Sequence, residues 1–264
     1  MSRPAAAGPT AGEPLRLIGA GGKRGCYAHP RERALCIKVP FTASGAAEAR
    51  REATYLARVE RRHGPLDGAH VARCHGSVAT TRGTGWLFDR VLDEGTGAPS
   101  PTLTDALDER AHAAESARWE DALERFLRWT AETALVVRDL TPDNFCVRRT
   151  ADGALRLVLI DGIGPAGTLP RWLPTRAYAR SRNARHAARY GLTSVASLLE
   201  RCREYRAARV RGSAAGNALQ RGTDASPRLL DGARPSPSSG TAMTRSSAGA
   251  TDDASASSTR RSTT

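Results

Sequence analysis

The sequence predicts an α+β fold with two lobes: an antiparallel sheet in the N-terminal lobe, and helices in an abridged C-terminal lobe. Short apolar runs separated by turn residues fill positions 14–92, which is typical of antiparallel strands. A long amphipathic pattern marked by Trp119 and Leu123 follows and indicates a helix. An Asp152-Gly153 pair then divides two apolar runs, which favours a hairpin.

The N-terminal lobe begins with a strand at Leu15, followed by a glycine-rich turn over residues 19–25. Gly19 and Gly21 fit the pattern G-x-G-x-x-G, whereas Arg24 stands where the third glycine is expected. Glycines let a backbone approach phosphate oxygens, and backbone amides donate to them. Gly19, Gly21 and Lys23 are therefore candidate phosphate-binding residues, with an ordinary glycine-rich hairpin as the alternative.

Lys38 lies in an apolar strand over residues 34–39. Lys23 and Lys38 are the only lysines among 40 basic residues, so a site that keeps lysine requires a compact ammonium group. The strand resembles the V-A-I-K strand that places an ammonium beside the α and β phosphates of a nucleotide. A lysine that faces solvent is the alternative.

A helix is expected over residues 46–63, with Glu48 and Glu52 one turn apart. Glu52 is preferred as the partner of Lys38, because it adjoins the apolar stripe of that helix. A surface glutamate that pairs with a neighbouring arginine is the alternative. The remaining expected elements are strands over 71–79 and 85–92, a short helix over 103–107 and a long helix marked by residues 119–135.

The run 137–144 reads V-R-D-L-T-P-D-N, and Asp161 follows after the expected hairpin. This spacing matches the kinase pattern H-R-D-L-x-x-x-N and the aspartate of D-F-G. Phosphoryl transfer requires an acid near the attacking hydroxyl and oxygen ligands for magnesium. We therefore predict Asp139 as the catalytic base, Asn144 and Asp161 as Mg²⁺ ligands, and ATP as the nucleotide. For Asp139 or Asn144 alone, a polar turn is the alternative. The order of strands, helices and loop predicts a protein-kinase-like fold.

Composition divides the chain into a disordered N-terminus (1–13), the N-lobe (14–92), the C-lobe (93–208) and a low-complexity tail (209–264). Such polar segments bury too little surface to offset the entropy of ordering. Neither a signal peptide nor an apolar run long enough to span a bilayer is expected. The five cysteines form no C-x-x-C pair, which favours a reducing cytoplasm.

Seven short motifs lie between about Leu17 and Arg182: Cys26-Tyr27-Ala28-His29-Pro30, Cys36-Ile37-Lys38, Arg51-Glu52, His75-Gly76, Gly83-Thr84-Gly85, Leu103-Thr104 and Leu140-Thr141-Pro142-Asp143-Asn144. Through these motifs the chain resembles the PhoP regulatory network protein YrbL family. The resemblance implies a kinase-like fold, ATP binding and phosphotransfer, with an unknown small-molecule or protein acceptor.

Departures from the kinase pattern leave alternatives open. Val137 replaces the usual histidine, Thr141 replaces the catalytic-loop lysine, and Gly162 follows Asp161 where phenylalanine is usual. A pseudokinase that senses nucleotide or acts as a scaffold is therefore the second hypothesis. The net charge of +13 and the arginine-rich segment 171–211 make nucleic-acid binding a third, although a solvated helical surface is the simpler explanation.

Overall fold

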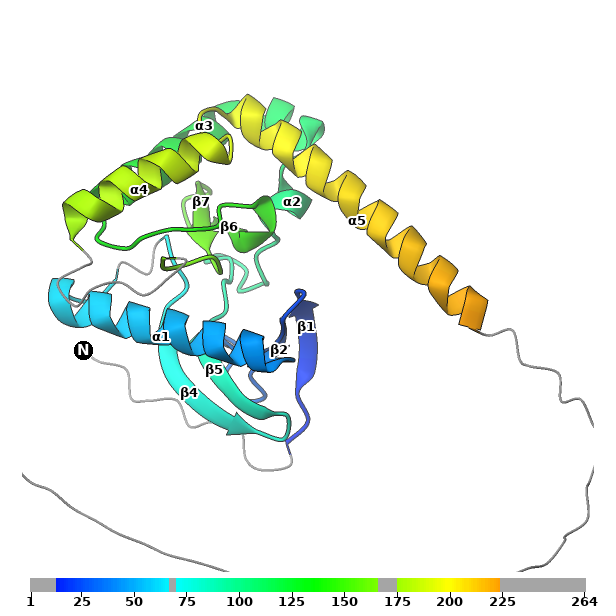
Figure 1. Cartoon of the computed structure of the whole chain (residues 1–264). Coiled ribbons are helices and arrows are strands. Elements are labelled where there is room, and N and C mark those ends of the chain that lie inside the picture. Colours follow the sequence, from blue (N-terminus) through cyan, green and yellow to red (C-terminus); the bar gives the residue numbers. More distant parts are fainter. Residues whose placement is uncertain (1–12, 67–69, 166–174, 224–264) are drawn as a thin grey trace, which may run out of the picture. The chain divides into compact units, whose positions relative to one another are not determined.

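The protein is described by a computed structural model over residues 13–66, 70–165 and 175–223, with side chains as far as Arg211. Its N-terminal part is a five-stranded antiparallel sheet in the order β1-β2-β3-β5-β4 (Figure 1). The strands are β1 (Arg16–Ala20), β2 (Arg24–Ala28), β3 (Leu35–Pro40), β4 (Cys74–Thr80) and β5 (Gly83–Asp89). The predicted α+β fold with an antiparallel N-terminal sheet is confirmed.

Strand β3 lies in the middle of this sheet, and its register decides which side chains share each face of the sheet. Lys38 lies opposite Cys26 of β2 and Trp86 of β5. Because successive residues of a strand point to opposite faces, Cys36 and Lys38 share one face, while Ile37 points to the other. That second face closes a small separate core of Tyr27, Leu35, Ile37, Val39 and Leu87.

Helix α1 (Ala43–His63) packs against β3 and β4. It begins three residues before the predicted start, because Thr42 caps it: the Thr42 hydroxyl accepts a hydrogen bond from Gly45 N at 3.1 Å. A side-chain acceptor at this position satisfies one of the free amide groups of a helix start. The buried stripe of α1 carries Glu52 and Tyr55 toward the core.

The segment before β4 joins the sheet to the C-terminal part. Val71 pairs in parallel with Leu159, and Ala72 N donates to Leu159 O at 2.9 Å. The strand predicted over 71–79 is thus divided, since its first residues pair with β7 and β4 begins only at Cys74. This pairing joins the β6–β7 hairpin to the segment that leads into the sheet.

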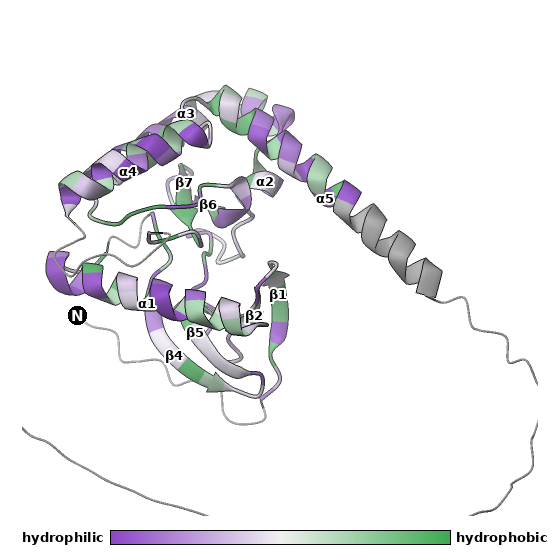
Figure 2. Ribbon diagram, in the orientation of Figure 1, coloured by the Kyte–Doolittle hydropathy of each residue, from purple (hydrophilic) through white to green (hydrophobic). Residues whose placement is uncertain are grey.

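The C-terminal part contains α2 (Leu103–Ala106), α3 (Glu109–Glu132), the short 3-10 helix η1 (Pro142–Asn144), the hairpin β6 (Phe145–Arg149) and β7 (Leu155–Leu159), α4 (Arg176–Arg189) and α5 (Val195–Thr223). Helix α3 lies beside α4 and packs on β7 (Figure 1). Figure 2 shows hydrophobic residues on β7 and many hydrophilic ones along α4.

Boundaries in the C-terminal part also differ from the prediction. Helix α3 ends at Glu132 because Thr133 adopts an extended backbone, and Leu135 is buried just beyond the helix. The predicted start of the tail at residue 209 falls inside α5, where Arg209 is held by two aspartates. The predicted disordered residues 1–12 and 224–264 lie outside the described residues. Within the described part, no helix has the length and apolar character needed to cross a bilayer.

Candidate active site

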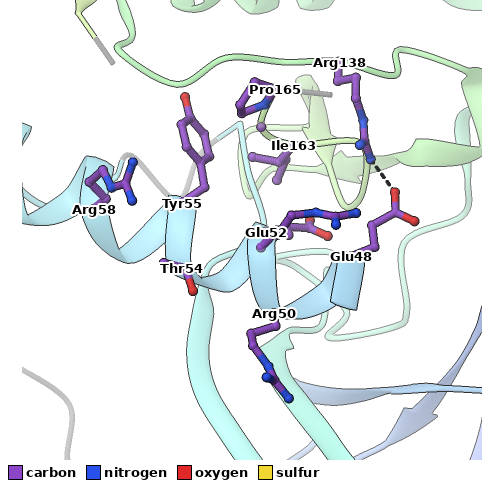
Figure 3. Close-up of a pocket in the computed structure, with 11 residues that line it drawn as sticks. Glu48, Arg50, Glu52, Thr54, Tyr55, Arg58, Arg138, Ile163 and Pro165 are labelled. Atoms are coloured by element: carbon purple, nitrogen blue, oxygen red, sulfur yellow. Dashed lines mark hydrogen bonds and ion pairs between the residues drawn. The ribbon is translucent and has the colours of Figure 1, made fainter. Parts of the chain in front are cut away.

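A cavity of about 760 Å³ lies between the sheet and the β6–β7 hairpin. Most of the predicted site residues line it: Gly19, Gly21, Lys23, Lys38, Asp139, Asn144 and Asp161. Glu52 lies behind it and lines a neighbouring cavity of about 250 Å³ (Figure 3). The fold therefore gathers these residues from both parts of the chain.

Main-chain hydrogen bonds bring Asp139, Asn144 and Asp161 together. Ile160 N donates to Asn144 O at 2.8 Å, which places Asp161 beside Asn144. The amide nitrogen of the Asn144 side chain donates to Asp139 O at 3.2 Å. Its amide oxygen is therefore the side-chain atom suited to a cation.

Gly162 lets the segment after Asp161 lie very close to the backbone of Asp139. Both Arg138 N and Asp139 N donate to Gly162 O, at 2.7 and 3.1 Å. Gly162 has a φ of +77°, and a Cβ built there would lie 2.4 Å from Asp139 O. Any larger residue would meet both a strained backbone and a clash, so glycine is required where the kinase pattern has phenylalanine.

The carboxylate of Asp161 is held as an anion. Burial alone would raise its pKa, but Lys38, Arg24 and the amide of Gly162 outweigh burial, and the pKa is lowered. Arg24 and Gly162 N both donate to Oδ1. Oδ2 has no protein donor among the hydrogen bonds of the described residues, so it can serve as a cation ligand.

Lys38 is buried within the cavity wall, at 7% exposure. Its ammonium donates to Ile160 O and lies 4.3 Å from the centre of the Phe88 ring. Burial would lower the pKa of Lys38, but the carboxylates of Asp161 and Glu52 outweigh it, so the pKa is raised. Lys38 is therefore a charged group that faces the cavity, and not a solvent-facing strand lysine.

The predicted ion pair between Lys38 and Glu52 is not present. Arg24 takes the place of Lys38: its guanidinium binds Glu52 Oε2 at 3.0 Å and also contacts Asp161. Because Glu52 is only 4% exposed, it is not the surface glutamate of the alternative reading. Its pKa is raised, first by burial and then by Asp161. In the sequence, Arg24 was notable only because it stands where the glycine pattern has its third glycine.

Glu48 forms the outer ion pairs of the same helix. It binds Lys23 at 2.9 Å. It also binds Arg138 at 2.8 Å (Figure 3). The hydrogen bond from Lys23 is the main reason that the pKa of Glu48 is lowered. Lys23 is thus at the cavity, with a side chain 61% exposed, and Arg138 ties the loop before Asp139 to α1.

The sequence did not single out two residues near Asp139 and its loop, Tyr190 and Arg209. Burial raises the pKa of the Tyr190 hydroxyl, and the charge of the Asp139 carboxylate raises it further. Arg209 of α5 binds Asp143 and Asp105 and lines the cavity. In a chain with so many arginines, no sequence signal distinguishes Arg209 from the others.

The sequence of this chain matches one family profile and two known proteins. The sequence profile of the PhoP regulatory network protein YrbL family matches residues 14–190. YrbL of Escherichia coli (strain K12) and YrbL of Shigella flexneri are each 32% identical to this chain over 170 residues, covering 62% of this chain and 80% of the relative.

A solved kinase domain is 15% identical, with a TM-score of 0.41, and the match covers 59% of this chain and 52% of that one. This structural likeness is partial, so the assignment of the site rests on its own geometry.

Proposed function

The chain belongs to the PhoP regulatory network protein YrbL family, and we propose that it binds Mg²⁺–ATP in the large cavity and transfers the γ-phosphate to an acceptor. The observation that carries the proposal is the gathering of Lys38, Asp139, Asn144 and Asp161 on one cavity of about 760 Å³. A cavity of this size with a few convergent polar groups is typical of a ligand site.

Lys38 is suited to bind phosphate. It stays protonated because two carboxylates offset its burial, and a buried ammonium attracts phosphate oxygens strongly. Glu52 Oε1 is buried without a hydrogen-bond partner, and a buried unpaired acceptor calls for an explanation. We infer that this atom is the acceptor for Lys38 when its ammonium turns from Ile160 toward a nucleotide.

Asn144 and Asp161 fit a magnesium ion that also binds phosphate. Among the described residues, no three His, Cys, Asp or Glu side chains lie close enough to hold a metal by themselves. Magnesium commonly takes one or two protein oxygens and completes its shell with phosphate and water. The amide oxygen of Asn144 and Oδ2 of Asp161 are those oxygens, and the ion would neutralise charge on the phosphates.

Asp139 is suited to accept the proton of an attacking hydroxyl. Its Oδ1 accepts a hydrogen bond from Thr141 N at 3.2 Å, which orients the carboxylate. A positioned base in hydrogen-bond reach of the reacting hydroxyl is the minimum for this step.

Binding is tested by thermal unfolding in a titration with Mg²⁺–ATP. At a hundredfold excess over Kd we expect a stabilisation of about 2.7 kcal/mol, or a rise in Tm of about 5 to 10 °C. The variants Lys38→Ala and Asp161→Asn should lose most of this rise. Asp152→Asn, at the turn of the hairpin, removes a carboxylate outside the cavity and should retain it. The proposal would be contradicted if the Tm of the wild-type protein did not rise, or if it rose equally in all variants.

A pseudokinase that binds nucleotide without turnover is the second candidate. The observation in its favour is that Arg24 bridges Asp161 and Glu52, so a cation at Asp161 competes with a guanidinium already held there. The absence of the usual histidine and lysine at Val137 and Thr141 points the same way.

Transfer of label from radiolabelled ATP to a cell extract separates the two candidates. For an active enzyme we expect labelled products whose formation falls at least about a hundredfold in Asp139→Asn, the usual contribution of a general base. Asp121→Asn, on the exposed side of α3, is the matched control and should label as the wild type does. Nucleotide binding without any label that depends on Asp139 would favour the pseudokinase.

A further inference from the structure

Three of the five cysteines line the large cavity: Cys26, Cys36 and Cys146. Cys26 lies directly opposite Lys38 in the sheet, and Cys36 precedes Lys38 by two residues. Residues two apart in a strand, and residues directly opposite in neighbouring strands, share a face. The two thiols and the ammonium therefore project from one face of the sheet into the cavity, while Cys146 reaches it from β6.

These thiols are neither paired as disulfides nor arranged to hold a metal. All five cysteines are free, and the described residues contain no His, Cys, Asp or Glu cluster suited to a metal ion. Cys36 is 5% exposed, whereas Cys26 is partly exposed. A small molecule that enters the cavity thus meets Cys26 before it meets Cys36.

The surroundings of Cys26 favour its thiolate. The pKa of Cys26 is lowered to about 7, first by the neighbouring Cys36 thiol and then by the positive charges of Lys38 and Arg90, against the effect of burial. The thiolate is the nucleophilic form of cysteine. Cys26 is therefore both within reach of a small solute and activated.

We propose that Cys26 is a modification site for small-molecule disulfides, and that the mixed disulfide formed there occupies the cavity. The Cys26 thiolate attacks one sulfur of R–S–S–R. The S–S bond of the reagent breaks, and a new S–S bond joins Cys26 to one R–S group. Cys26 is oxidised, and the leaving sulfur is reduced and departs as R–S⁻, which takes a proton from water.

An adduct at Cys26 would stand beside Lys38, on the face where the phosphates of ATP are proposed to bind. Modification and nucleotide binding should then exclude each other. This link rests on the proposed function, whereas the reactivity of Cys26 does not.

The test reacts the full chain with 2,2′-dithiodipyridine, follows release of thiopyridone, and locates the adduct by peptide mass spectrometry. We expect a fast phase of one thiol, at least about tenfold faster than the remaining cysteines because of its thiolate character, with the adduct on Cys26. The fast phase should be lost in Cys26→Ser and Cys26→Ala. It should persist in Cys74→Ser, the control for a partly exposed cysteine outside the cavity. A fast phase that survives in both Cys26 variants, or an adduct on Cys146 or Cys74, overturns the proposal.

A second arm repeats the reaction with saturating Mg²⁺–ATP. Slower labelling of Cys26 supports the shared cavity, and unchanged labelling while Mg²⁺–ATP still raises the Tm overturns it. If Mg²⁺–ATP does not raise the Tm, the proposed function fails, and the first arm still decides whether Cys26 is the modification site.

Discussion

Gly162→Ala is expected to unfold the centre of the candidate active site, with a loss of about 3 kcal/mol or more in the free energy of unfolding. The substituted residue would hold a left-handed backbone with φ +77°, and its Cβ would lie 2.4 Å from Asp139 O and 2.8 Å from Asp139 Cβ. The loop could relieve this clash only by moving away from Asp139. The rise in Tm with Mg²⁺–ATP should therefore be lost as well. Urea denaturation of the variant, with and without nucleotide, measures both effects.

Gly153→Ala is the matched control for this substitution. Gly153 also has a positive φ, +80°, but the nearest atom to a Cβ there, on Arg118, is 4.0 Å away. The control thus carries the backbone strain, about 1 kcal/mol, without the clash. If Gly162→Ala proved no less stable than Gly153→Ala, the contact between Gly162 and Asp139 would not constrain the site.

Asn183→Ala is expected to cost about 3 to 5 kcal/mol of stability, since unsatisfied buried groups cost about 1–3 kcal/mol each. Asn183 is 1% exposed. Its Oδ1 accepts from Val137 N at 2.9 Å, and its Nδ2 donates to Thr130 O and Leu135 O at 2.8 and 2.9 Å. The substitution leaves these three main-chain groups without their partner, just before the loop that carries Asp139.

Chemical denaturation of Asn183→Ala, Asn183→Asp and Arg180→Ala tests this network. Asn183→Asp keeps an acceptor for Val137 N but loses both donors, so it should also be destabilised. Arg180→Ala, on the exposed side of α4, should stay within about 0.5 kcal/mol of the wild type. A change below about 1 kcal/mol in Asn183→Ala would contradict the assigned role of the network.

The elements of the fold were predictable where a periodic pattern and its end signals agree. The hairpin is an example: its Asp152-Gly153 turn lies between strands whose register pairs Phe145 with Leu159. The prediction failed at Val71, because no local pattern shows that this residue pairs with β7 and not with the sheet. Long-range pairing of this kind depends on the packed fold.

The candidate site was predictable to the extent that its residues form a spaced motif. Asp139, Asn144 and Asp161 have that spacing, and the structure places them on one cavity with Lys38. The prediction that Lys38 pairs with Glu52 was wrong, because Arg24 binds Glu52 from β2. The role of Asn183 gave no signal, since a single asparagine in an arginine-rich helix looks like a surface residue.

Local periodicity and residues close together in the chain were enough to predict the order of strands and helices, the family and the acidic motif. Three features appeared only in the folded chain: which cation pairs with Glu52 and Asp161, why Gly162 must be glycine, and that three thiols share the cavity with Lys38. All three have the same cause. Contacts between side chains depend on distances across separate elements, and in a chain with many arginines the sequence does not show which one a buried carboxylate will meet.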